Sequence, residues 1–88
     1  MFARTIRVEY EQNGTRQPCP MRWLDSFAMR SFTNDAVFDD TLPVDDGVLQ
    51  IGARVPLARL QAALEDWFRR KSYLPPDARL SVSEDYVS

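Results

Sequence analysis

Residues 4–17, RTIRVEYEQNGTRQ, decide the fold. Apolar and polar side chains alternate strictly along the first half of this stretch, which places Ile6, Val8 and Tyr10 on one face of a strand and charged residues on the other. Asn13-Gly14 is the dipeptide that best tolerates the positive φ angles of a type I′ turn. The stretch therefore predicts a half-buried strand that turns back into a second strand.

The return strand, over residues 15–17, is predicted to be short and to lie at an edge of the sheet. The tight turn sets Glu11 near Arg16. The chain then reaches Pro18 and Pro20, which both lack the N–H group that a central strand donates to its neighbour.

A helix is predicted over residues 21–32, because apolar residues such as Trp23 and Phe27 recur four positions apart. Asn34 and Asp35 break this pattern. An extended segment is then expected to run from residue 36 to a turn at residues 45–47.

A second hairpin is predicted around Asp46-Gly47, a dipeptide suited to a tight turn. Pro43 lies in the first arm and has no N–H group, so this arm is predicted to border solvent. A two-residue turn fixes the cross-strand pairs, which are Val44 with Leu49 and Leu42 with Ile51.

The second helix has the clearest periodic pattern. Pro56 suits a first helical turn, and Arg69-Arg70-Lys71 lie at the other end, where cations complement the helix dipole. Pro75-Pro76 are expected to stop the helix. Its apolar stripe consists of Leu57, Leu60, Ala63, Leu64, Trp67 and Phe68.

A last strand is predicted over residues 79–87, with Leu80 and Val82 directed inward. Residues 1–88 then form a single α+β domain, in which two helices cover a small antiparallel or mixed sheet of four or five strands. The order of elements favours a ferredoxin-like, split βαβ arrangement. Such a fold hosts unrelated activities, so it assigns no function.

The composition excludes several classes of function. The 88 residues, 44% of them hydrophobic, suffice for one modest core. There is no His, which removes Ser-His-Asp and Cys-His catalysis and imidazole metal ligands. The single cysteine, Cys19, cannot form an internal disulfide, and no nearby residue is placed to lower its pKa. We therefore expect no catalytic residues, no metal, no cofactor and no enzymatic activity.

An acidic run is the first candidate for binding. It holds five carboxylates and no Lys or Arg, on residues Asp35, Asp39, Asp40, Asp45 and Asp46. Concentrated charge of this kind steers encounter with a basic protein partner, which could itself be a nucleic-acid-binding complex. The alternative is a solvated hairpin in which Asp residues form turns. The spacing does not match a calcium-binding loop.

Direct binding of nucleic acid is the second hypothesis, because ten of the eleven basic residues are Arg. The candidate residues are Arg4, Arg7, Arg69, Arg70 and Lys71. The net charge of −2 and the scatter of Arg along the chain count against this hypothesis.

Most large aromatic residues are expected in the core, and an exposed Trp would be a natural hot spot for a partner. These residues are Trp23, Phe27, Phe32, Trp67, Phe68 and Tyr73.

In its length, acidity and preference for Arg over Lys, the chain is similar to small bacterial and phage-encoded inhibitors, such as anti-CRISPR and toxin-immunity proteins. This similarity of size and charge implies action by occluding or bridging a protein partner.

A third hypothesis is a self-associating subunit, but Pro18, Pro20 and Pro43 interrupt the edge strands and hinder pairing with a second copy. We expect a monomer or weak dimer without membrane association. No apolar run follows the first residues, which favours a cytoplasmic location.

Overall fold

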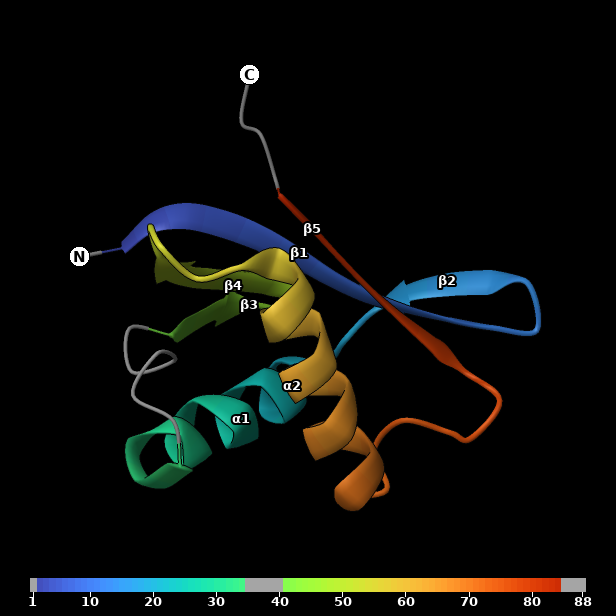
Figure 1. The fold of residues 1–88 in the computed structure, drawn as a ribbon. Helices are drawn as coiled ribbons and strands as arrows, with labels where there is room; N and C mark the ends of the chain where they lie inside the picture. Colours follow the sequence, from blue (N-terminus) through green and yellow to red (C-terminus); the bar gives the residue numbers. More distant parts are fainter. Residues whose placement is uncertain (1, 35–40, 85–88) are drawn as a thin grey trace.

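The computed structural model describes residues 2–34 and 41–84, which form a five-stranded antiparallel sheet and two helices (Figure 1). The elements follow the predicted order, and the α+β class is confirmed. Their bounds are β1 Phe2–Gln12, β2 Thr15–Pro18, α1 Met21–Asn34, β3 Leu42–Asp45, β4 Val48–Gly52, α2 Leu57–Arg70 and β5 Arg79–Glu84.

Strand β1 is the centre of the sheet because three strands pair with it. One edge of β1 pairs with β5 over Ile6 to Glu11. The other edge is shared: β4 pairs with its first half, and β2 pairs with its second half from Glu9 onward. Strand β3 extends the sheet beyond β4. With β2 set aside, the strand order is β5-β1-β4-β3 and the chain reads βαββαβ, the element order of a split βαβ unit.

Three backbone hydrogen bonds form a junction where β2 and β4 meet on β1. The Val8 N–H group donates to the Gly47 carbonyl at 2.8 Å, and the Val8 carbonyl accepts from the Cys19 N–H group at 3.0 Å. The Gly47 N–H group donates to the Cys19 carbonyl at 2.7 Å. These bonds tie the tip of the second hairpin to the end of the first hairpin.

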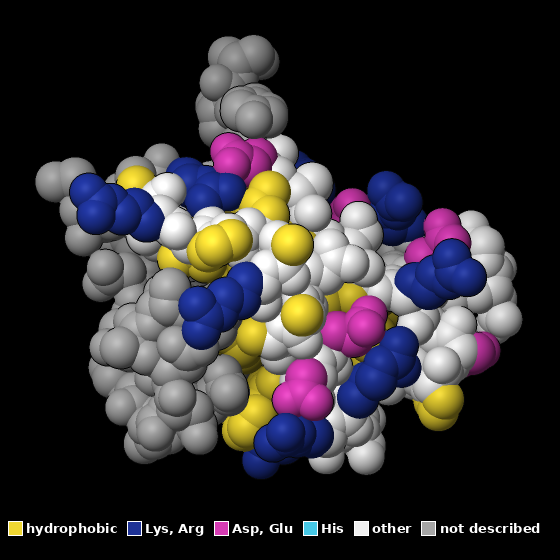
Figure 2. Space-filling model, in the orientation of Figure 1, with side chains coloured by type: hydrophobic (Ala, Val, Ile, Leu, Met, Phe, Trp, Pro, Cys, Tyr) yellow, Lys and Arg dark blue, Asp and Glu magenta, His cyan; other side chains and the backbone are white. Residues whose placement is uncertain are grey.

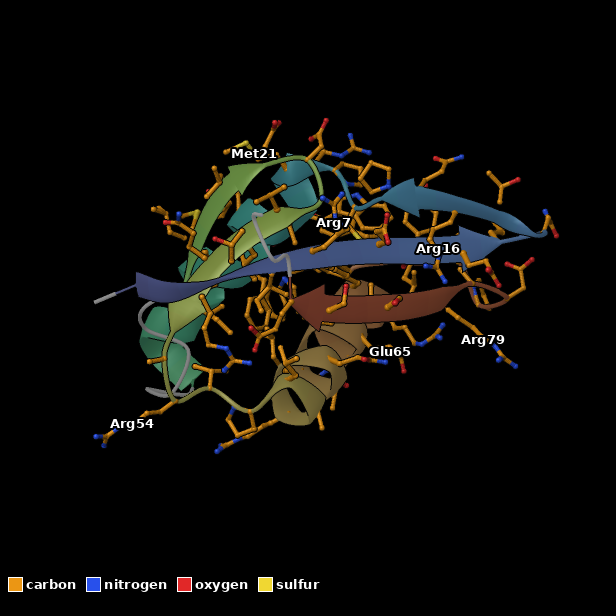
Figure 3. The ribbon with its side chains drawn as sticks, turned by 90° about the horizontal axis from the view of Figure 1, so that it is seen from above. Arg7, Arg16, Met21, Arg54, Glu65 and Arg79 are labelled. Carbon is orange, nitrogen blue, oxygen red and sulfur yellow. The ribbon has the colours of Figure 1, made fainter. Side chains whose placement is uncertain are left out.

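Both helices lie on one face of the sheet, as Figures 1 and 3 show, and the core fills the space between. Strand alternation explains the inward set, because every second residue of β1 and β5 points toward the helices, as predicted. The buried hydrophobic residues are Ile6, Val8, Cys19, Trp23, Leu24, Phe27, Leu49, Ile51, Val55, Leu60, Leu64, Phe68, Leu74, Ala78 and Leu80.

Both predicted turns form, but the register of the second hairpin was predicted wrongly. In the first turn Asn13 and Gly14 have φ values of 54° and 78°, and Glu11 pairs with Arg16 as expected. In the second hairpin a bulge between Pro43 and Asp45 shifts the pairing by one residue. The observed pairs are Asp45 with Val48, Pro43 with Leu49, and Leu42 with Gln50.

Helix α2 ends before the prolines that were expected to stop it. Ser72 adopts a left-handed conformation with φ of 60°, and its N–H group donates to the Arg69 carbonyl at 3.1 Å. The Tyr73 N–H group donates to the Phe68 carbonyl at 2.9 Å, and the two rings lie 6.4 Å apart. This bond pattern and the ring contact define a Schellman motif, which turns the chain at residues 71–73.

Candidate functional site

The two described carboxylates of the predicted acidic run take part in local structure. The Asp46 Oδ1 atom accepts a hydrogen bond from the Met21 N–H group at 2.7 Å, which caps α1 from another element. Pro20, the residue before α1, offers no capping side chain. The Asp45 Oδ1 atom accepts from the Asp46 N–H group at 2.8 Å. The turn-forming role that the sequence suggested as an alternative is thus present.

The other acidic residues of this run, Asp35, Asp39 and Asp40, lie outside the described residues.

Exposed apolar side chains lie on α1 and on β3. Among the described residues the exposed large hydrophobic side chains are Met21 at 40%, Met29 at 68%, Leu42 at 44% and Val44 at 48%. The two elements pack against each other, and Met21 is joined to the second hairpin through Asp46. We name Met21, Leu42, Val44, Asp45 and Asp46 together the α1–β3 surface.

Sequence reasoning missed the apolar part of this surface. The predicted register set Val44 and Leu42 opposite the buried residues Leu49 and Ile51, whereas the bulge leaves both side chains exposed. Pro43 was the available signal, because a residue without an N–H group in a strand indicates an edge or a bulge. Pro43 and the bulge also make the β3 edge unsuited to pairing with a further strand.

The predicted basic set does not form one patch. Arg4 is held inside the structure: its Nε atom donates to Glu84 Oε1 at 2.8 Å, and its Nη1 atom donates to the Val55 carbonyl. Arg69 donates to the Pro75 and Ala78 carbonyls at 3.3 and 3.1 Å. These two side chains hold loops in place.

The remaining members of the basic set lie on two separate elements. Arg70 forms an ion pair with Asp66 at 3.1 Å, and the Lys71 Nζ atom lies 4.8 Å from the centre of the Trp67 ring. Arg7 is exposed on β1, in the middle of the sheet face that the helices leave open (Figure 3).

That open sheet face carries a mixed row of charges. The cross-strand register sets Glu11 between Arg16 of β2 and Arg79 of β5, and both arginines are exposed. Arg16 also lies 3.9 Å from Glu9. Arg7, Arg16 and Arg79 thus share one face, on which Glu9 and Glu11 offset part of their charge (Figure 3).

The single cysteine has a structural position. Cys19 is fully buried in the junction, where burial and then the nearby Glu9 raise the pKa of its thiol to about 12. A thiol with such a pKa is not a nucleophile near neutral pH. Among residues 2–34 and 41–84, no three Cys, Asp or Glu side chains lie close enough to hold a metal ion.

The aromatic residues divide between core and partial exposure. Trp23 is buried and stacks on Tyr73 at 5.6 Å between ring centres, with Phe68 edge-on at 5.4 Å. Trp67 is only partly buried, and its Nε1 atom donates to Ser26 Oγ at 3.1 Å. The core role predicted for most of these residues is confirmed for Trp23, Phe27 and Phe68, while the side chain of Phe32 lies outside the described residues.

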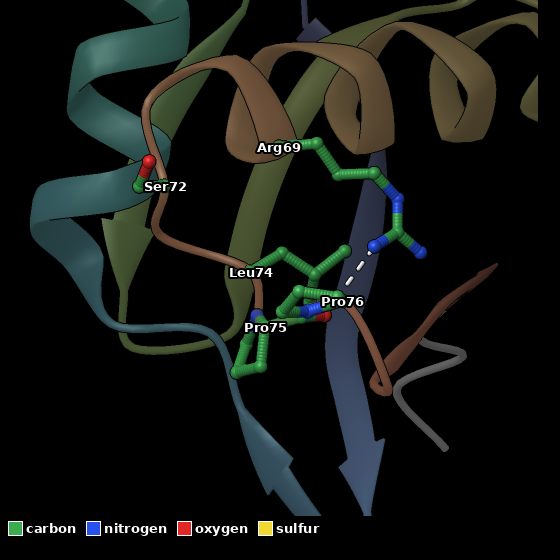
Figure 4. Close-up of a pocket in the computed structure, with 5 residues that line it drawn as sticks. All are labelled: Arg69, Ser72, Leu74, Pro75 and Pro76. Atoms are coloured by element: carbon green, nitrogen blue, oxygen red, sulfur yellow. Dashed lines mark hydrogen bonds between the residues drawn. The ribbon is translucent and has the colours of Figure 1, made fainter.

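A shallow hollow of about 230 Å³ lies beside the end of α2 (Figure 4). It is lined by Arg69, Ser72, Leu74, Pro75 and Pro76. Because Arg69 is turned to the Pro75 carbonyl, the lining offers mainly apolar contact. None of the charged groups proposed for binding, other than Arg69, lines this hollow.

Within the described part of the chain, no helix is both long and apolar enough to span a membrane. Comparison with known proteins adds no relative: no family model matches the chain, and neither a curated protein nor a solved structure is significantly similar to it.

Proposed function

We propose that this chain is a small, non-enzymatic protein-binding module that occludes a protein partner through the α1–β3 surface. The observation that carries the proposal is that β3 exposes Leu42 and Val44 next to the carboxylates of Asp45 and Asp46, on a hairpin to which Met21 is tied by a hydrogen bond. The buried centre of an interface is more apolar than its rim, and charges at the rim steer and select the partner. A partner that presents a basic rim around an apolar centre fits this surface best.

The buried, unreactive Cys19 supports the non-enzymatic reading, since it removes the strongest nucleophile of the described residues. A single cysteine without a disulfide partner also suits a reducing compartment. We therefore place this function in the cytoplasm.

The test is affinity capture of partners from lysate with the tagged protein, followed by titration with each recovered protein. Two variants probe the surface: Leu42→Ser with Val44→Thr, and Asp45→Asn with Asp46→Asn. The Asn pair removes charge but keeps the acceptor oxygens that hold Met21 and the turn. Met29→Gln is the control, because this exposed residue is about 12 Å along α1 from Met21.

The apolar variant should weaken a specific partner about tenfold or more, and the Asn variant should flatten the salt dependence of binding. The control should bind as wild type. If both variants bound the captured protein as tightly as wild type, the α1–β3 surface would not be the docking site.

Nucleic-acid binding is kept as a second candidate because Arg7, Arg16 and Arg79 share the open sheet face. Fluorescence anisotropy with short DNA and RNA at two salt concentrations tests it. Phosphate contacts would give a steep loss of affinity with salt, which the variant with all three arginines changed to Gln would lack. Arg70→Gln is the matched control, and absence of any binding at low salt excludes this candidate.

A further inference from the structure

We draw no further inference here: the strongest candidate, the shallow apolar hollow beside the end of α2, carries nothing because Arg69 in its lining already donates to the Pro75 and Ala78 carbonyls, the face of α2 seen in Figure 2 mixes acidic with basic side chains, and nothing in the structure shows what covers the hollow.

Discussion

Gly47 should be the least replaceable glycine of the chain. It has a φ of 71°, and a Cβ atom there would lie 2.6 Å from the Pro18 Cβ atom and 3.1 Å from the Val8 carbonyl oxygen. The left-handed conformation alone costs an alanine about 1–2 kcal/mol. Overpacking against the junction adds about 1–3 kcal/mol, because relief of the clash must displace backbone that the three junction bonds hold.

We therefore expect Gly47→Ala to lower the free energy of unfolding by about 2–5 kcal/mol, out of about 4–13 kcal/mol for a domain of this length. Gly14→Ala is the matched control, since Gly14 has a φ of 78° and no atom within 4 Å of an added Cβ atom. Gly14→Ala should lower the free energy of unfolding only by the cost of the left-handed conformation, about 1–2 kcal/mol. Denaturant unfolding followed by fluorescence of the buried Trp23 measures both. Equal losses for the two variants would refute the steric argument.

Three further predictions concern stability. Asp46→Ala should lower the free energy of unfolding by about 1 kcal/mol because α1 loses its cap, and Asp46→Asn should lower it by less than half of that. Equal losses in denaturant titration would show that Asp46 does not act as a cap. Ser72→Gly should raise the melting temperature, by relief of about 1 kcal/mol of left-handed strain, and a lower melting temperature would contradict this. Because burial raises the Cys19 pKa from 9.0 to about 12, the unfolded chain releases this proton first, and stability should fall as pH rises from about 9 to about 12. Cys19→Ala should show a smaller alkaline loss, and native protein at pH 8 should resist thiol reagents until it unfolds.

The sequence was most informative where local chemistry alone determines structure. The alternation in β1, the turn at Asn13-Gly14 and the apolar stripe of α2 all depend on neighbours within a few residues, and each was predicted correctly. The register of the second hairpin was predicted wrongly, because a bulge at Val44 depends on how β3 packs against α1 and how Gly47 meets the first hairpin. The exposure of Leu42 and Val44 follows from that bulge.

Long-range partners set the roles of the charged residues. Arg4 and Glu84 are 80 positions apart, and no local pattern could show that they pair. The sequence indicates only a turn role for Asp46. Its hydrogen bond to Met21 forms because the junction holds Gly47 next to Cys19. Arg4 and Arg7 were predicted as one basic set, but they lie on opposite faces of β1, because Arg4 alternates in step with the buried Ile6 and Val8 and reaches Glu84 on the helix side.

The position of β1 has a consequence for how the protein is made. This strand is synthesised first, yet it lies in the middle of the sheet and its pairing with β5 joins residues 6–11 to residues 79–84. A nascent chain that ends before Arg79 leaves one edge of β1 open and Arg4 without Glu84. Contacts between residues so far apart in the chain slow folding. The domain should therefore complete its fold only after β5 has left the ribosome, and chains released before that point should be targets for proteolysis or aggregation.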